Sequence, residues 1–163
     1  MGLTKFLLSL CIIGLTSTHV SPAPAPDQKE FVDAHNAVRA EVGVPPLKWD
    51  NTIAAYAQKY ANSRIEKCEF EHSDYNSVNY GECIAEGWEE LKPKDAVAAW
   101  AKEKPNYDYK SNSCVNGECG HYTQLVWRDT KLIGCARAKC RSNWMFVTCN
   151  YFPIGNWEGM RPY

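Results

Sequence analysis

The sequence predicts a single α+β domain in which helices pack against an antiparallel hairpin. Three segments in the first two thirds of the chain carry apolar residues at helical spacing, and two strand-like segments near the C-terminus are separated by a short turn. No repeating strand–helix–strand pattern is visible. The chain has 163 residues, 45% hydrophobic and 23% charged, which suits one globular domain and is too apolar for a disordered chain.

The N-terminal segment reads as a secretory signal peptide over residues 1–25, with cleavage expected between residues 16 and 25. Lys5 precedes the apolar run Phe6–Leu15, and small residues and alternating prolines follow it. The run is too short to span a bilayer, so we expect no transmembrane anchor. We therefore expect a secreted domain over residues 26–163. Its near-neutral charge, without a basic face, also argues against nucleic-acid binding.

The first two helices follow from their apolar spacing. A helix is expected over residues 27–42, where Phe31, Ala34, Val38 and Val42 form a stripe that ends at Gly43. His35 lies on the buried side of this stripe. Asp50 is expected to cap a second helix, whose apolar stripe consists of Ile53, Ala57, Tyr60 and Ala61.

The remaining elements are shorter. Residues 68–81 are polar and irregular, and residues 82–87 are expected to form a short strand. Pro93 suits the first turn of a third helix, on which Ala96, Trp100 and Glu103 share one face before Pro105 ends it. Residues 120–127 are expected to form a short helix with His121 and Leu125 on one side. Residues 132–139 and 144–151 are expected to pair as a hairpin.

Cysteine usage predicts disulfide bonds. Eight cysteines occur, one of them in the leader, so seven remain in a secreted chain. Reflection of the hairpin about Ser142 places Cys135 opposite Cys149, at the separation that a disulfide needs. Cys114 and Cys119 flank a turn-like stretch and suit a local link. Cys68 and Cys140 are then taken as the long-range pair. Cys83 is left over, as a buried thiol, as the link of a dimer or as a further metal-binding group.

Five segments carry a family resemblance. GHYTQLVW at residues 120–127 and CNYFPIGNW at residues 149–157 resemble the two signature segments of the CAP superfamily. HNAVR at residues 35–39, EKPNYDY at residues 103–109 and the final RPY resemble plant pathogenesis-related protein 1 within it. The resemblance implies a three-layer α-β-α sandwich with a central antiparallel sheet, the same three disulfides, and a monomeric plant defence protein secreted to the apoplast.

The resemblance also implies a cleft built from His35, Glu82, Glu103 and His121. Two imidazoles and two carboxylates can hold a divalent metal such as zinc, although no cofactor is expected to be required. We expect binding rather than catalysis, because the sequence carries no hydrolase motif. Ser73 beside His72 is no triad on adjacency alone. A metal-dependent hydrolase that uses the four cleft residues is the alternative.

Two further features complete the functional expectations. Tyr107 and Tyr109 lie on a loop anchored by Cys114 and can cover a rigid apolar ligand. The resemblance implies binding of a sterol or lipid there, with antifungal or anti-oomycete action through sequestration. The segment Pro153–Tyr163 resembles a C-terminal defence-signal peptide, so the chain is alternatively its precursor. Phe152 stands where the family commonly has Asp, and Cys83 where it normally has Asn.

Overall fold

The computed structural model describes residues 26–163, so the expected signal peptide lies outside the described residues. The main elements are α1 (Pro26–Glu41), β1 (Lys48–Trp49), α2 (Asn51–Arg64), β2 (Gly81–Trp88), α3 (Pro93–Ala101), α4 (Gly120–Leu125), β5 (Leu132–Lys139) and β6 (Trp144–Phe152). Short 3₁₀ turns, η1 (Tyr75–Val78) and η2 (Lys104–Asn106), and a small ribbon of β3 (Tyr107–Asp108) and β4 (Ser113–Cys114) lie between them. Within this part of the chain, no helix is both long and apolar enough to cross a membrane.

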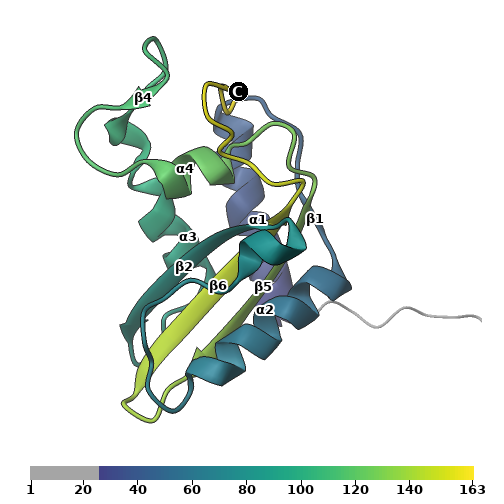
Figure 1. Cartoon of the computed structure of the whole chain (residues 1–163), viewed down its shortest axis with the longest axis vertical. Helices are drawn as coiled ribbons and strands as arrows, with labels where there is room; N and C mark the ends of the chain where they lie inside the picture. The colour runs from purple at the N-terminus through teal and green to yellow at the C-terminus, as the bar shows by residue number, and fades with distance from the viewer. Residues whose placement is uncertain (1–25) are drawn as a thin grey trace, which may run out of the picture.

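A four-stranded sheet in the order β1-β5-β6-β2 forms the middle layer. Strand β6 pairs antiparallel with β5 and with β2, and the two-residue strand β1 runs parallel to β5. Helix α2 covers one face of the sheet, and α1, α3 and α4 lie on the other (Figure 1). The expected α-β-α sandwich is therefore confirmed.

Side-chain alternation along β6 divides the core between the two faces. Phe146 packs with Ala57 and Ala61 of α2. Val147, Cys149 and Tyr151 pack with the side chains of α1 and α3. Alternate side chains of β6 therefore pack against helices on opposite faces of the sheet. The apolar stripes of the helices face the sheet, as expected.

Helix α2 touches β5 at Gly134, where the absence of a side chain is essential. A Cβ atom at this position would lie 2.1 Å from the backbone nitrogen of Ala54. Ala57 and Ala61, one and two turns further along α2, are fully buried. Small residues on both elements therefore set the close approach of the helix to the sheet.

The described residues form three disulfides, Cys68–Cys140, Cys114–Cys119 and Cys135–Cys149. Cys135 lies directly opposite Cys149 in the β5–β6 register, as the symmetry of the hairpin predicts. Cys83 is a free, buried cysteine, which agrees with the buried-thiol interpretation. The pairing scheme expected from the sequence is thus present in full.

The third helix is shorter than expected. It ends at Ala101, and the chain continues into η2 at Lys104. Proline at position 105 disfavours α-helical geometry at the residue before it, so the helix cannot run on through this point. Glu103 consequently lies between α3 and η2, at the start of the loop that leads to β3.

Candidate functional site

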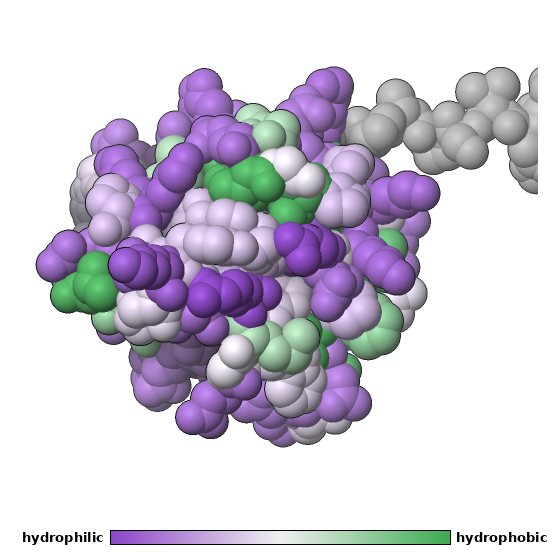
Figure 2. Space-filling view, turned by 90° about the horizontal axis from the view of Figure 1, so that it is seen from above, coloured by the Kyte–Doolittle hydropathy of each residue, from purple (hydrophilic) through white to green (hydrophobic). Residues whose placement is uncertain are grey.

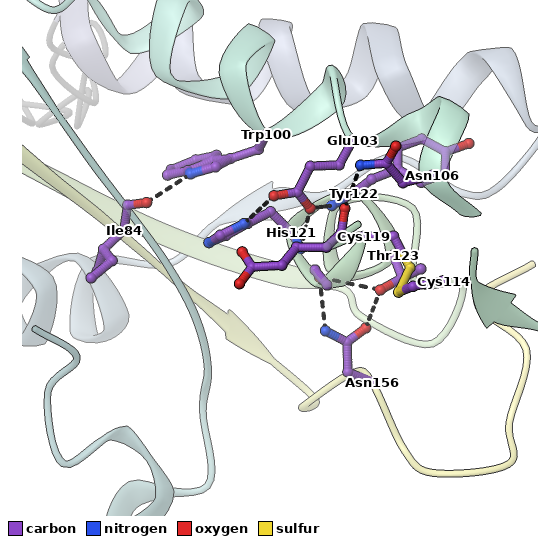
Figure 3. Close-up of polar contacts among 12 residues, drawn as sticks. Ile84, Trp100, Glu103, Asn106, Cys114, Cys119, His121, Tyr122, Thr123 and Asn156 are labelled. Carbon is purple, nitrogen blue, oxygen red and sulfur yellow. Dashed lines mark hydrogen bonds and ion pairs between the residues drawn. A yellow bond between two sulfur atoms is a disulfide. The ribbon is translucent and has the colours of Figure 1, made fainter. Parts of the chain in front are cut away.

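Glu103 and His121 form a bonded pair. One carboxylate oxygen of Glu103 lies 2.5 Å from Nδ1 of His121, and the other accepts backbone N–H groups of His121 and Tyr122 at 2.9 and 3.2 Å. The N-terminal turn of α4 thereby holds the carboxylate by its free amides. Figure 3 shows Glu103 and His121 pointing toward each other beside Trp100.

Trp100 fixes the other side of this pair. Its indole nitrogen donates to the carbonyl oxygen of Ile84 on β2 at 2.9 Å. Its ring stacks on the imidazole of His121, with a centroid separation of 6.3 Å and an interplanar angle of 14°. The imidazole is therefore oriented by the carboxylate on one atom and by the indole on one face.

A second pair of the same kind joins Glu82 and His72. Nδ1 of His72 lies 2.8 Å from one oxygen of Glu82, which also accepts the amide of Ser73 at 2.9 Å. The other oxygen accepts the Ser73 hydroxyl at 2.5 Å and the Asn150 amide at 3.1 Å. Burial acts to raise the pKa of Glu82, but the hydrogen bonds from His72, Ser73 and Asn150 outweigh it, and the pKa is lowered.

The two pairs share one chemical arrangement. In each pair a carboxylate holds Nδ1 of an imidazole, which leaves Nε2 as the atom for an external ligand. Carboxylate–imidazole pairs of this type orient histidines that bind metals. Ser73 and His72 both hydrogen-bond to Glu82. These two neighbouring residues therefore do not form a nucleophile–base pair.

His35 does not belong to an accessible cleft. Its side chain is fully buried, Nδ1 lies 2.7 Å from the carbonyl oxygen of Phe31, and Nε2 lies 2.9 Å from the hydroxyl of Tyr151. Burial, opposed by the bond to Phe31, lowers the pKa of His35 to about 4. The expectation for His35 is wrong, because both ring nitrogens already have partners inside the core.

Arg39, the last residue of the HNAVR motif, has a structural role. Its guanidinium is fully buried and donates to the carbonyl oxygens of Pro45, Leu125, Trp127 and Thr130. Burial lowers the pKa of Arg39 to about 10, so it stays charged at neutral pH. The motif therefore ties α1 to the loop after α4 and is structural.

Glu118 lies next to the Glu103–His121 pair. One ligand atom each from Glu103, Glu118 and His121 lie within 4.8 Å of one another. Glu118 is exposed, whereas the other two residues are partly buried. Two carboxylates and an imidazole are donors that suit zinc and similar divalent ions.

A separate hollow of about 330 Å³ lies between the loop after η2 and the C-terminal segment. Its apolar lining includes Tyr107, Trp127, Trp157, Met160 and Pro162. Its volume is at the lower end of the range for ligand pockets, roughly 300–1,000 Å³. Figure 2 views the end of the molecule where α4, β4 and the C-terminus meet, and hydrophobic residues form small groups there among hydrophilic ones.

The two asparagine side chains of this hollow are already paired. Asn112 accepts the Tyr107 hydroxyl at 2.7 Å and donates to the carbonyl of Met160 at 3.2 Å. Asn156 accepts the Thr123 hydroxyl at 2.8 Å and donates to the carbonyl of Gly120 at 2.9 Å. The hollow therefore favours an apolar ligand that makes few hydrogen bonds.

The two loop tyrosines have different surroundings. Tyr107 lines the hollow. Tyr109 is 46% exposed, stacks on Tyr163 with a centroid separation of 5.1 Å, and carries the guanidinium of Arg161 over its ring at 4.8 Å. Tyr109 thus holds the tail in place, while Tyr107 faces the candidate ligand space.

The segment Pro153–Tyr163 is bonded to the domain along its length. The carbonyl of Pro153 accepts the Thr130 hydroxyl at 2.9 Å, and the carbonyl of Pro162 accepts the amide of Arg128 at 2.7 Å. Arg161 donates to the carbonyls of Tyr109 and Lys110. Trp157 is 56% exposed and lines the hollow, so other residues anchor this tail.

Sequence reasoning missed His72, Glu118 and the tail as contributors to these sites. His72 lies in the irregular stretch between Arg64 and β2, where no periodicity indicates which side chains face inward. The available signal was an imidazole ten positions before a glutamate that begins a strand. Residues 156–160 and Pro162 form a wall of the hollow only because the tail folds back beside the loop.

Comparison with known proteins agrees with this architecture. The model of the CAP family, the cysteine-rich secretory protein family, matches residues 32–151, and the chain therefore belongs to that family. It is 46% identical over 163 residues to the basic form of pathogenesis-related protein 1 of Nicotiana tabacum, covering all of this chain and 90% of that protein.

Solved structures share the fold. Venom allergen-like protein 4 of Schistosoma mansoni superposes with a TM-score of 0.70 at 31% identity, covering 86% of this chain and 95% of that one. A structure of NaASP2 with Zn²⁺ superposes with a TM-score of 0.69 at 25% identity and covers 84% of each chain.

Proposed function

We propose that this protein is a secreted plant defence protein of the pathogenesis-related 1 type that binds a sterol or a similarly rigid lipid. Its full-length similarity to the tobacco protein supports the defence role. Three disulfides in a chain of this size are typical of the extracellular environment. The hollow between the tyrosine loop and the tail is the observation that carries the ligand class.

The lining explains why a rigid apolar ligand fits. Aromatic rings and a methionine cover large flat surfaces at low conformational cost, and the paired amides of Asn112 and Asn156 leave few polar groups to satisfy. A ring system with one polar end can insert its apolar body between Trp157 and Tyr107. Sequestration of a sterol would deprive fungi or oomycetes that depend on it, which is the proposed antimicrobial action.

The test is a direct titration of the purified secreted protein with a fluorescent sterol. We expect saturable binding, and Trp157→Ala should weaken it about tenfold, which corresponds to roughly 1.4 kcal/mol. Trp88→Ala is the matched control, because Trp88 is also more than half exposed but lies at the far end of β2. Absence of saturable binding, or equal losses in both variants, would contradict the proposal.

A second candidate function is divalent metal binding at His121. The specific observation is the Glu103–His121 pair with Glu118 beside it, and the structure with Zn²⁺ has the same fold. A bound zinc ion would act as a Lewis acid toward its ligands. Zinc titration followed by calorimetry should show binding that His121→Gln abolishes and Glu90→Gln leaves unchanged.

We infer that Glu82 and Glu103 orient imidazoles and do not serve as the base of a hydrolytic reaction. A hydrolytic site needs a carboxylate that is free to take a proton from water. Both oxygens of Glu82 and both oxygens of Glu103 already accept hydrogen bonds from the protein. These acids therefore orient imidazoles. Metal-dependent turnover of an ester or peptide that is lost in Glu103→Gln would contradict this inference.

A further inference from the structure

Three cysteines lie in one row across three neighbouring strands. Cys83 of β2 is directly opposite Cys149 of β6, and Cys149 is directly opposite Cys135 of β5. All three belong to the same buried cluster on the α1 and α3 face of the sheet. Cys149 is bonded to Cys135, and Cys83 is the free thiol. The disulfide therefore has an unpaired thiol as its cross-strand neighbour.

The spacing of the row permits either pairing of Cys149. The Cα atoms of Cys135 and Cys149 are 4.0 Å apart, which is the close spacing of a non-hydrogen-bonded pair. In an antiparallel sheet such a residue forms a hydrogen-bonded pair on its other side, with Cα atoms about 5.5 Å apart. That separation lies within the range of disulfides, roughly 4.4–6.8 Å, so Cys83 is within bonding reach of Cys149.

A directed chain of hydrogen bonds ends at Tyr151 in the core. The carbonyl of Phe31 only accepts, so Nδ1 of His35 donates to it. Nε2 of neutral His35 then accepts the Tyr151 hydroxyl proton. Tyr151 and Cys83 belong to the same buried cluster.

We propose that Cys83 is an exchanging thiol that can move the core disulfide from Cys135–Cys149 to Cys83–Cys149. The Cys83 thiolate attacks Sγ of Cys149, a new sulfur–sulfur bond forms, and the bond to Cys135 breaks. Cys135 leaves as a thiolate and takes up the proton that Cys83 lost. The step conserves electrons and needs no oxidant. Strands β2 and β5 lie on opposite sides of β6, so Cys83 and Cys135 flank Cys149 on opposite sides, and exchange of this kind proceeds by attack of a thiolate on a disulfide sulfur.

Burial and the sheet hold this exchange back in the folded protein. Burial raises the pKa of the Cys83 thiol well above its usual value, the nearby carboxylates of Glu103 and Glu82 add to the rise, and the bond with Tyr151 opposes it. Little thiolate therefore forms at neutral pH. Strand β2 is an edge strand of the sheet, so local opening of this edge exposes the thiol without unfolding the domain.

Exchange moves the free thiol to a different place. Cys83 is 1% exposed, whereas Cys135 is 6% exposed and borders an open hollow of about 630 Å³ that is also lined by Phe31 and Trp49. The product thiol therefore lies beside space that a small thiol or disulfide reagent can enter. Cys149 is the disulfide partner in both states, so the exchange connects the buried Cys83 with Cys135, which borders the hollow.

The test locates the free thiol before and after local opening. The purified secreted protein is incubated at alkaline pH in urea below its unfolding midpoint and quenched with acid. Its free thiol is labelled with N-ethylmaleimide in denaturant at mildly acidic pH, and the labelled and disulfide-linked peptides are identified by mass spectrometry after non-reducing digestion. We expect the label on Cys83 at the start, and a shift of the label to Cys135 with incubation, together with a linked Cys83–Cys149 peptide.

Any of three outcomes would overturn the proposal. The label can stay on Cys83 throughout, or it can appear on Cys68, Cys114, Cys119 and Cys140 as readily as on Cys135, which would indicate general scrambling. Cys83→Ser is the control and should keep Cys135–Cys149 intact under the same conditions. Cys83→Ala serves the same purpose should the buried serine hydroxyl prevent folding. Loss of the Cys135–Cys149 link in a folded control would equally contradict the proposal.

Discussion

Nε2 of His35 lies 2.9 Å from the hydroxyl of Tyr151 inside the core, and this relationship makes the stability of the domain depend on pH. Burial lowers the pKa of His35 from 6.5 to about 4. Between these values the unfolded chain binds a proton that the folded protein does not. Stability is therefore complete above pH 6.5 and falls as the pH is lowered toward 4, by about 2 kcal/mol at pH 5.

Urea unfolding between pH 7.5 and 5 measures this loss. Hydrogen bonds lower the pKa of Glu82 against the opposing effect of burial, so Glu82 adds a loss only near and below its ordinary value of 4.5. The chosen range therefore separates the loss due to His35 from the loss due to Glu82. His35→Gln should flatten the dependence, whatever its effect on absolute stability. Equal slopes in the wild type and the variant would show that His35 is not buried in its neutral form.

Arg39 should tolerate no replacement by lysine. The guanidinium serves four carbonyl groups from distant parts of the chain, and a single ammonium group on a flexible stem cannot reach them all. We expect Arg39→Lys to lower the free energy of unfolding by about 2–4 kcal/mol, since buried carbonyls lose their donors. Arg137→Lys is the matched control, because Arg137 is partly exposed and pairs with Asp27. A similar small loss in both variants would contradict this role.

Gly134 should also tolerate no replacement, in this case for a steric reason. A methyl group at this position meets the backbone of Ala54, which cannot turn aside as a side chain can. We expect Gly134→Ala to destabilise the domain by about 3 kcal/mol or more. Gly120→Ala provides the comparison, since its nearest neighbour is the Asn156 amide at 4.0 Å. Thermal unfolding of the two variants decides the point, and indistinguishable melting temperatures would refute the close packing.

The sequence was informative where a local pattern controls the structure. Alternation in the two strands and the symmetry of their turn predict the β5–β6 register and therefore the Cys135–Cys149 bond. Helical spacing predicts α1, α2 and the start of α3. Family resemblance assigns Glu103 and His121 to one cleft, and the structure joins these two residues in one hydrogen-bonded pair.

The sequence was uninformative where a long-range contact decides the role of a residue. An inward-facing histidine at position 35 fits a core and a cleft equally well, and only the partners Phe31 and Tyr151 distinguish them. His72 carries no periodic pattern, so its bond to Glu82 could not be anticipated. The contribution of Trp157 to the hollow depends on how the tail folds back, which no local pattern encodes.

Photochemical crosslinking tests the central claim, the location of the ligand, most directly. A sterol carrying a photoreactive group is bound to the purified secreted protein, irradiated, and the modified residues are mapped by mass spectrometry. The account predicts labels within residues 112–114 and 156–160, which line the hollow, and their loss when unlabelled sterol competes. Competed labels confined to another face of the domain would contradict it.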